Sequence, residues 1–106
     1  MSHWIDAVGA DELTDGGRRL LRPEGREIAL FRVAGRHYAL DDSCPHAGSS
    51  LCGGELEGGF VRCRGHGLRF DLATGCLLGH SAFGVATYAV REHEGRIQID
   101  LGPDAA

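Results

Sequence analysis

Two matched pairs of cysteine and histidine constrain this chain more than any other feature of its sequence. One residue separates Cys44 from His46, and two residues separate Cys63 from His66. Residues 47–62 lie between the two pairs. Thiolate and imidazole groups are ligands that protein zinc sites and some iron–sulfur clusters have in common. The four side chains therefore predict a metal centre.

The order of the four ligands bears on which metal they hold. Zinc sites usually place like ligands together, as C-x(2-4)-C followed by H-x(3-5)-H, whereas the order here is Cys, His, Cys, His. In an extended loop, two side chains that are two positions apart point the same way, so Cys44 and His46 can reach the two irons of one cluster. The spacing favours an iron–sulfur centre, and a tetrahedral Cys2His2 zinc site is the alternative.

The residues around the two pairs extend the pattern. They are Cys44–Gly48, Leu51, Gly54, Cys63, His66–Gly67, Phe70–Asp71 and Thr74–Gly75. Over residues 44–75 the chain closely resembles the ligand motif of the Rieske [2Fe-2S] proteins, whose second half reads C-P-x-H-G-x-x-F-D-x-x-T-G. The resemblance implies one [2Fe-2S] cluster, with the thiolates of Cys44 and Cys63 on one iron and the imidazoles of His46 and His66 on the other.

Short apolar runs separated by turn signals predict an all-β fold. The expected strands are 4–8, 18–21, 27–33, 37–40, 60–62, 68–71, 76–78, 87–91 and 96–101, and residues 79–84 are expected to form a connecting loop. A length of 106 residues allows one domain, 1–106. The Rieske resemblance implies an antiparallel β sandwich with a smaller cluster-binding β subdomain. That subdomain, about residues 42–79, would be inserted in a basal sandwich of residues 1–41 and 80–106.

Charge and hydropathy narrow the functions that the chain can have. A formal net charge of −4 disfavours nucleic acid as a partner, because nucleic acid requires a basic surface. No run approaches 18 consecutive apolar residues, and the N-terminal residues lack the pattern of a signal peptide. We therefore expect no membrane span, a cytoplasmic location and a monomer.

The same resemblance predicts where the reduction potential lies. Histidine ligation makes the oxidised cluster formally neutral, which raises the potential above that of an all-thiolate cluster. High-potential Rieske proteins add a Ser and a Tyr, two and four residues after the last ligand histidine, whose hydroxyls donate to the cluster. Leu68 and Phe70 occupy these positions here and cannot donate, so we expect the low end of the range, around −150 mV. Arg64, where the family usually has Pro, would raise the potential slightly or point into solvent.

The two remaining cysteines are Cys52 and Cys76. Some high-potential members carry an extra cysteine in each ligand motif and join the two, but Gly48 and Gly65 occupy those positions here. In a cytosolic protein we expect Cys52 and Cys76 to be free thiols.

Four acidic residues near the first ligand motif have two interpretations. Asp41, Asp42, Glu55 and Glu57 could form an acidic docking rim for a basic partner, or they could be solvated loop residues.

Three functions follow from these observations. The first is a soluble Rieske-type ferredoxin, not catalytic alone, that carries one electron at a time from a flavin reductase to a terminal oxygenase of the ring-hydroxylating type. The second is the small subunit of NAD(P)H-dependent nitrite reductase, which the motif also resembles. Many of those subunits have lost ligands that are all present here, which favours the ferredoxin. The third is a zinc-stabilised structural module.

Overall fold

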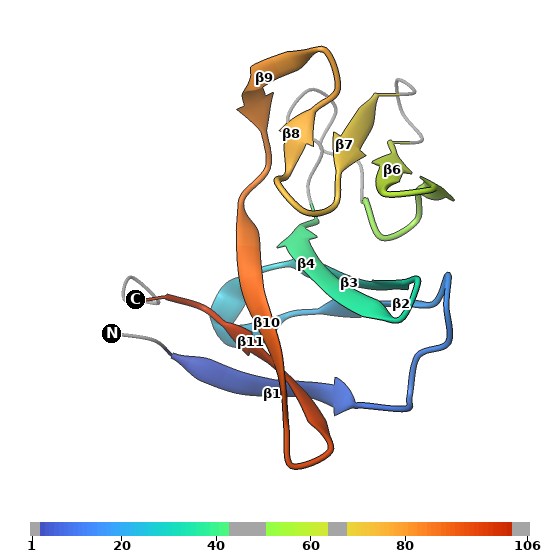
Figure 1. The fold of residues 1–106 in the computed structure, drawn as a ribbon. Helices are drawn as coiled ribbons and strands as arrows, with labels where there is room; N and C mark the ends of the chain where they lie inside the picture. Colours follow the sequence, from blue (N-terminus) through green and yellow to red (C-terminus); the bar gives the residue numbers. More distant parts are fainter. Residues whose placement is uncertain (1–2, 43–50, 64–67, 103–106) are drawn as a thin grey trace.

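The computed structural model describes residues 3–42, 51–63 and 68–102. In these ranges the strands form two antiparallel sheets, as Figure 1 shows, and one 3-10 turn, η1 (Pro23–Gly25), follows the second strand. The first sheet contains β1 (Trp4–Gly9), β2 (Arg18–Leu21), β3 (Ile28–Val33), β4 (Arg36–Asp41), β10 (Thr87–His93) and β11 (Arg96–Asp100). The second sheet contains β5 (Glu55–Glu57), β6 (Phe60–Arg62), β7 (Arg69–Asp71), β8 (Cys76–Leu77) and β9 (His80–Gly84). The predicted all-β fold is confirmed.

The first sheet has the strand order β1-β11-β10-β4-β3-β2 and contributes to both sides of a basal core. Strand β10 joins its two halves, because Thr87 and Tyr88 pair with β4 and residues 89–93 pair with β11. Apolar side chains from both halves pack together and form this core. They are Val8, Leu13, Ile28, Leu30, Ala39, Ile97, Ile99 and Leu101. This packing of two halves of a sheet gives the predicted sandwich.

Strand β3 is buried on both of its faces. Its residues Ile28, Ala29, Leu30 and Phe31 are all fully buried. Because successive side chains of a strand point to opposite faces, Ile28 and Leu30 enter the basal core and Ala29 and Phe31 enter a second one. A fully buried apolar side chain of this size contributes about 1.5–3 kcal/mol. Strand β3 is thus the layer on which the second sheet rests.

The second sheet has the order β5-β6-β7-β8-β9 and lies between β4 and β10 in the chain (Figure 1). Its apolar side chains pack on β3 and β4 and form what we call the intersheet core. Its buried members are Ala29, Phe31, Leu40, Leu51, Val61, Cys63, Phe70, Leu72 and Leu77. The core joins the second sheet firmly to the basal sandwich.

Two strands were not predicted. Strand β9 occupies residues where a connecting loop was expected, and it pairs with β8 through Gly84 and His80. Glycine permits this pairing, since a Cβ atom on Gly84 would lie 2.3 Å from the carbonyl oxygen of Gly75. Strand β5 is short, with Glu55 opposite Arg62. The division at residues 42 and 79 stays a prediction, and the strands of the second sheet run from Glu55 to Gly84.

Candidate metal centre

Cys63 is the predicted ligand that lies within the described residues. It directly follows β6, its side chain is fully buried, and it belongs to the intersheet core. The other three predicted ligands, Cys44, His46 and His66, lie outside the described residues.

A short hairpin sets the position of Cys63. Strands β6 and β7 are antiparallel, with Val61 opposite Phe70. The pairing ends in a backbone hydrogen bond, in which the N–H of Cys63 donates to the carbonyl oxygen of Leu68 at 2.7 Å. The segment that carries the second predicted Cys/His pair is therefore closed at its base by the hairpin itself.

The segment with the first predicted pair is closed at its base in a similar way. The N–H of Leu51 donates to the carbonyl oxygen of Asp42 at 2.6 Å, and the N–H of Cys52 donates to Oδ1 of Asp42 at 2.7 Å. The N–H of Asp42 itself donates to the carbonyl oxygen of Glu27 at 2.9 Å. Asp42 is 2% exposed, so one buried residue holds the returning chain through both its backbone and its side chain.

The two bases lie against each other. Leu51 and Cys63 are both fully buried in the intersheet core. At Gly54 the chain approaches β6 so closely that a Cβ atom would lie 2.3 Å from the carbonyl oxygen of Arg62. Only glycine fits such an approach without displacing backbone. Both predicted ligand segments thus begin and end at one place, and two thiolates and two imidazoles from them suit a mixed-ligand iron–sulfur cluster.

Within residues 3–42, 51–63 and 68–102, no three His, Cys, Asp or Glu side chains gather into a metal-binding group. Three of the four predicted ligands fall outside these ranges. The ligand set therefore stays a prediction, supported by the arrangement of the two bases.

Cys52 and Cys76 are free thiols, as predicted. Burial raises the pKa of the Cys52 thiol, the carboxylate of Asp42 raises it further, and the guanidinium of Arg18 opposes them. A thiol with a raised pKa is less reactive at neutral pH. Cys52 thus contributes to the site through its backbone, which bonds Asp42 and Arg18, rather than through its thiol.

Arg18 is a residue near the site that the sequence did not reveal. It lies on β2, and its Nη1 donates to the carbonyl oxygen of Cys52 at 3.2 Å and to that of Gly54. Its guanidinium stands over the ring of Phe31, 5.6 Å from the ring centre. These partners are distant in the sequence, so no local pattern could have indicated the contact.

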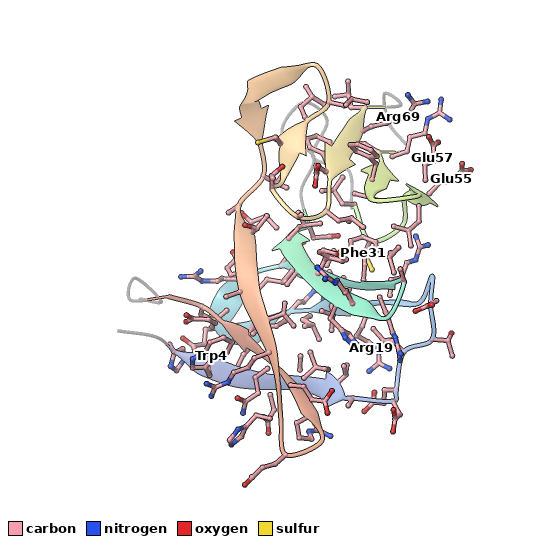
Figure 2. All side chains as sticks on the ribbon, viewed as in Figure 1. Trp4, Arg19, Phe31, Glu55, Glu57 and Arg69 are labelled. Carbon is pink, nitrogen blue, oxygen red and sulfur yellow. The ribbon has the colours of Figure 1, made fainter. Side chains whose placement is uncertain are left out.

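The acidic docking rim was one of two interpretations of four acidic residues, and one of them, Glu57, is paired within the chain. Figure 2 shows Glu57 beside Arg69, and the carboxylate forms ion pairs of 2.9 Å with Arg69 and 3.3 Å with Arg62. Glu55 is exposed and lies opposite Arg62 across the β5–β6 pair. Two carboxylates next to two guanidinium groups do not make an acidic surface.

Asp41 and Asp42, the other two acidic residues near the first ligand motif, have partners within the chain. Asp42 is buried, and Oδ1 of Asp41 accepts a hydrogen bond from the hydroxyl of Tyr88. Burial and this bond raise the pKa of Tyr88. Asp41 and Tyr88 line a polar recess of about 620 Å³ where the second sheet joins β10. Asp41 thus joins β4 to β10 within the first sheet, and Asp42 joins the end of β4 to the chain at Cys52.

Comparison with known proteins identifies the domain. The family model of the Rieske [2Fe-2S] domain matches residues 3–89. The chain belongs to the Rieske [2Fe-2S] family. This confirms the resemblance seen in the ligand motif and, with it, one [2Fe-2S] cluster as the cofactor. The zinc module is set aside.

Two curated relatives of similar length are ferredoxin components of dioxygenase systems. The ferredoxin component of the naphthalene 1,2-dioxygenase system of Pseudomonas aeruginosa is 38% identical over 99 residues, covering 92% of this chain and 95% of the relative. The ferredoxin component of the 2,4-dinitrotoluene dioxygenase system of a Burkholderia strain is 34% identical, covering 93% and 96%. The prediction of a Rieske ferredoxin, an electron-transfer component that is not catalytic alone, is confirmed.

Solved Rieske structures share the fold. A chain in the complex of reduced oxygenase and oxidised ferredoxin of carbazole 1,9a-dioxygenase is 27% identical, with a TM-score of 0.83 and 92% of each chain covered. The putative NADH-dependent nitrite reductase small subunit of Mycobacterium tuberculosis is also 27% identical, with a TM-score of 0.85 and coverage of 94% and 96%. Among the described residues, no helix is long and apolar enough to cross a membrane.

Proposed function

We propose that the chain carries single electrons from a flavin-dependent reductase to a terminal oxygenase of the ring-hydroxylating type. One observation carries this proposal. The chain matches 95% of the length of the ferredoxin component of a naphthalene 1,2-dioxygenase system, but only 26% of the oxygenase subunit of 3-chlorobenzoate-3,4-dioxygenase. The match thus spans nearly all of that carrier and about a quarter of that oxygenase subunit.

The ligands in this proposal are those that the sequence predicted. When bound, a Rieske cluster supplies reversible one-electron oxidation and reduction. The thiolates of Cys44 and Cys63 would hold one iron and the imidazoles of His46 and His66 the other. The burial of Cys63, and the meeting of the two segment bases at Gly54, support this assignment.

The rest of the domain keeps these ligands in place. Leu51, Val61 and Phe70 are buried around Cys63 in the intersheet core and exclude water from behind its thiolate. The bonds from Cys63 to Leu68 and from Leu51 to Asp42 hold together the two ends of each ligand segment. A preorganised ligand set changes little in shape when it gains or loses charge, which suits an electron carrier.

The two partners would use the carrier in turn. It would accept an electron in one complex and release it in another, and we place both steps in the cytoplasm with the chain acting as a monomer. The carbazole 1,9a-dioxygenase structures, in which a ferredoxin is bound to an oxygenase, support the second complex.

The nitrite reductase small subunit is the second candidate. The fold does not decide between the two, since the TM-scores are 0.85 for that subunit and 0.83 for the carbazole 1,9a-dioxygenase complex. The complete set of four predicted ligands and the relatives at 34–38% identity favour the ferredoxin.

A reconstitution experiment separates the two candidates. Cluster-loaded protein is mixed with NADH, a flavin reductase and the oxygenase component of a naphthalene 1,2-dioxygenase system, and in parallel with NADH and a nitrite reductase large subunit. We expect hydroxylated product that depends on this chain and no stable complex with the large subunit. A stoichiometric complex that consumes nitrite, with no product from the oxygenase, would assign the chain to nitrite reductase.

A further inference from the structure

Two oppositely charged side chains hold the segment that follows the first predicted ligand pair. Asp42 accepts the N–H of Cys52, and Arg18 donates to the carbonyl oxygens of Cys52 and Gly54. Cys52 thus donates its N–H to an anion, and its carbonyl oxygen accepts a hydrogen bond from a cation. Neither charge takes part in the ligand set.

Asp42 is the more buried of the two. At 2% exposure it is the one buried charged residue in the described part of the chain, and it lies two residues before the predicted ligand Cys44. Burying a carboxylate is costly unless hydrogen bonds compensate for the lost water. The N–H of Cys52, which donates to Oδ1 of Asp42, contributes to that compensation.

Arg18 reaches the same segment from the first sheet. Its guanidinium stacks over the fully buried ring of Phe31, which directs it toward Cys52 and Gly54. Its neighbour on β2, Arg19 (Figure 2), has a side chain that is 48% exposed and pairs with Glu12 at 3.1 Å. Since successive side chains of a strand point to opposite faces, the two arginines carry the same charge in different surroundings.

The charges of Asp42 and Arg18 both act on the thiol of Cys52. Apart from burial, the causes that shift its pKa are the carboxylate of Asp42, which raises it, and the guanidinium of Arg18, which lowers it. The charges of Asp42 and Arg18 therefore both act on Cys52, next to the end of the first ligand segment. Gly54, which Arg18 also binds, is the residue whose backbone lies against Arg62 beside Cys63.

We propose that Asp42 and Arg18 are positioning residues that close the first ligand segment and, through their charges, adjust the reduction potential of the cluster in opposite directions. The inference rests on the ligand set in the proposed function. Reduction adds one negative charge to the cluster, so a nearby carboxylate disfavours it and a nearby guanidinium favours it. Asp42 lowers the potential, and Arg18 raises it.

The test compares Asp42→Asn with Arg18→Gln in cluster-loaded protein, by redox titration followed by EPR. Asparagine keeps an oxygen that can accept the N–H of Cys52 and removes only the charge. We expect Asp42→Asn to raise the ratio of reduced to oxidised protein at fixed potential about threefold. At 59 mV per tenfold for one electron, this is an upward shift of about 28 mV. Arg18→Gln should lower the ratio about twofold, because Arg18 is less buried than Asp42 and water screens its charge more.

Two further variants separate charge from structure. Arg18→Lys keeps the positive charge but lacks the planar guanidinium group, so the reduction potential of this variant should equal that of the wild type. Arg19→Gln removes an equal charge from the neighbouring position and should also leave the potential in place. If Asp42→Asn does not load a cluster, the Arg18→Gln and Arg18→Lys pair decides alone, since only the former should lower the potential.

The outcomes that overturn the inference are distinct from failure of the proposed function. Shifts of Asp42→Asn and Arg18→Gln in the same direction would show loosening of the segment rather than a charge effect. An Arg18→Gln shift no larger than that of Arg19→Gln would likewise overturn it. A wild-type protein without a mixed-ligand cluster would instead contradict the proposed function.

Discussion

Cys63 and Leu68 are joined by a backbone hydrogen bond of 2.7 Å that closes the second predicted ligand segment at its base. Asp42 and Leu51 are joined in the same way across the first segment, at 2.6 Å. Each bond joins two backbone groups at the ends of a predicted ligand segment. The fold thus brings the ends of both segments to a shared base.

Replacing Cys63 should abolish the cluster. In Cys63→Ser a hydroxyl would replace the buried thiolate that is predicted to hold one iron. We expect loss of the visible absorption and of the reduced EPR signal, with iron and sulfide content near zero.

Cys76→Ser is the matched control for this change. Cys76 is a free, half-buried thiol on β8 and carries no ligand spacing. This variant should keep the colour and signal of the wild type. A coloured Cys63→Ser protein with an unchanged signal would refute the ligand assignment.

Gly54→Ala should destabilise the protein. A Cβ atom at Gly54 would lie 2.3 Å from the carbonyl oxygen of Arg62, so the chain must shift where the two bases meet. Overpacking of this kind costs typically about 1–3 kcal/mol of unfolding free energy. Denaturant unfolding of the purified protein measures the change.

Gly59→Ala provides the comparison, because no atom lies within 4 Å of a Cβ at Gly59. Its effect should stay within about 0.5 kcal/mol. Equal effects of the two substitutions would mean that the close approach at Gly54 is unimportant for stability.

His37 should make the protein less stable in mild acid. Burial, with a further contribution from Arg32, holds the pKa of His37 below its ordinary value. As the pH falls, the unfolded chain binds a proton at this histidine before the folded chain does, so stability is lost between the ordinary pKa and the lower folded one. The melting temperature of His37→Gln should therefore fall less than that of the wild type between about pH 7.5 and pH 5.

The exposed His93 serves as the control for this pH dependence. His93→Gln should follow the wild-type curve. Parallel curves for the wild type and His37→Gln would exclude the folded-state environment of His37 as a cause of acid sensitivity.

The reduction potential should lie near −150 mV, at the low end for Rieske clusters. Leu68 and Phe70 occupy the two positions from which high-potential family members donate hydroxyl hydrogen bonds. Phe70 is 1% exposed in the intersheet core and has no polar group. A redox titration of the wild-type protein tests this, and a value close to +300 mV would mean that other donors replace the missing hydroxyls.

Most of the strands could be predicted because their own residues carry the signal. The apolar run of β3 between Gly25 and Gly35 indicated a strand, and its double burial explains why the run does not alternate. Strand β9 was not predicted because Gly79 precedes it and Gly84 ends it, and glycines in these positions are typical of a loop. The pairing of Gly84 with β8 depends on the approach of another strand, which local sequence does not contain.

The supports of the site were harder to predict than its ligands. The Cys/His spacing is local, so the motif could be recognised from the residues alone. Arg18 contacts residues 34 and 36 positions away, and the burial of Asp42 depends on β-strand packing. The sequence left Asp42 either in an acidic docking rim or in a solvated loop, whereas it is a buried acceptor that holds the chain after the first ligand pair.

We propose that two cysteines and two histidines hold the [2Fe-2S] cluster of this domain. The low-temperature EPR spectrum of the purified protein, oxidised and then reduced with dithionite, tests this ligand set directly when iron and sulfide are assayed in the same sample. We expect two irons and two sulfides per chain and a reduced signal with the low average g value of mixed Cys/His ligation. A colourless protein that contains stoichiometric zinc, even when prepared anaerobically, would contradict it.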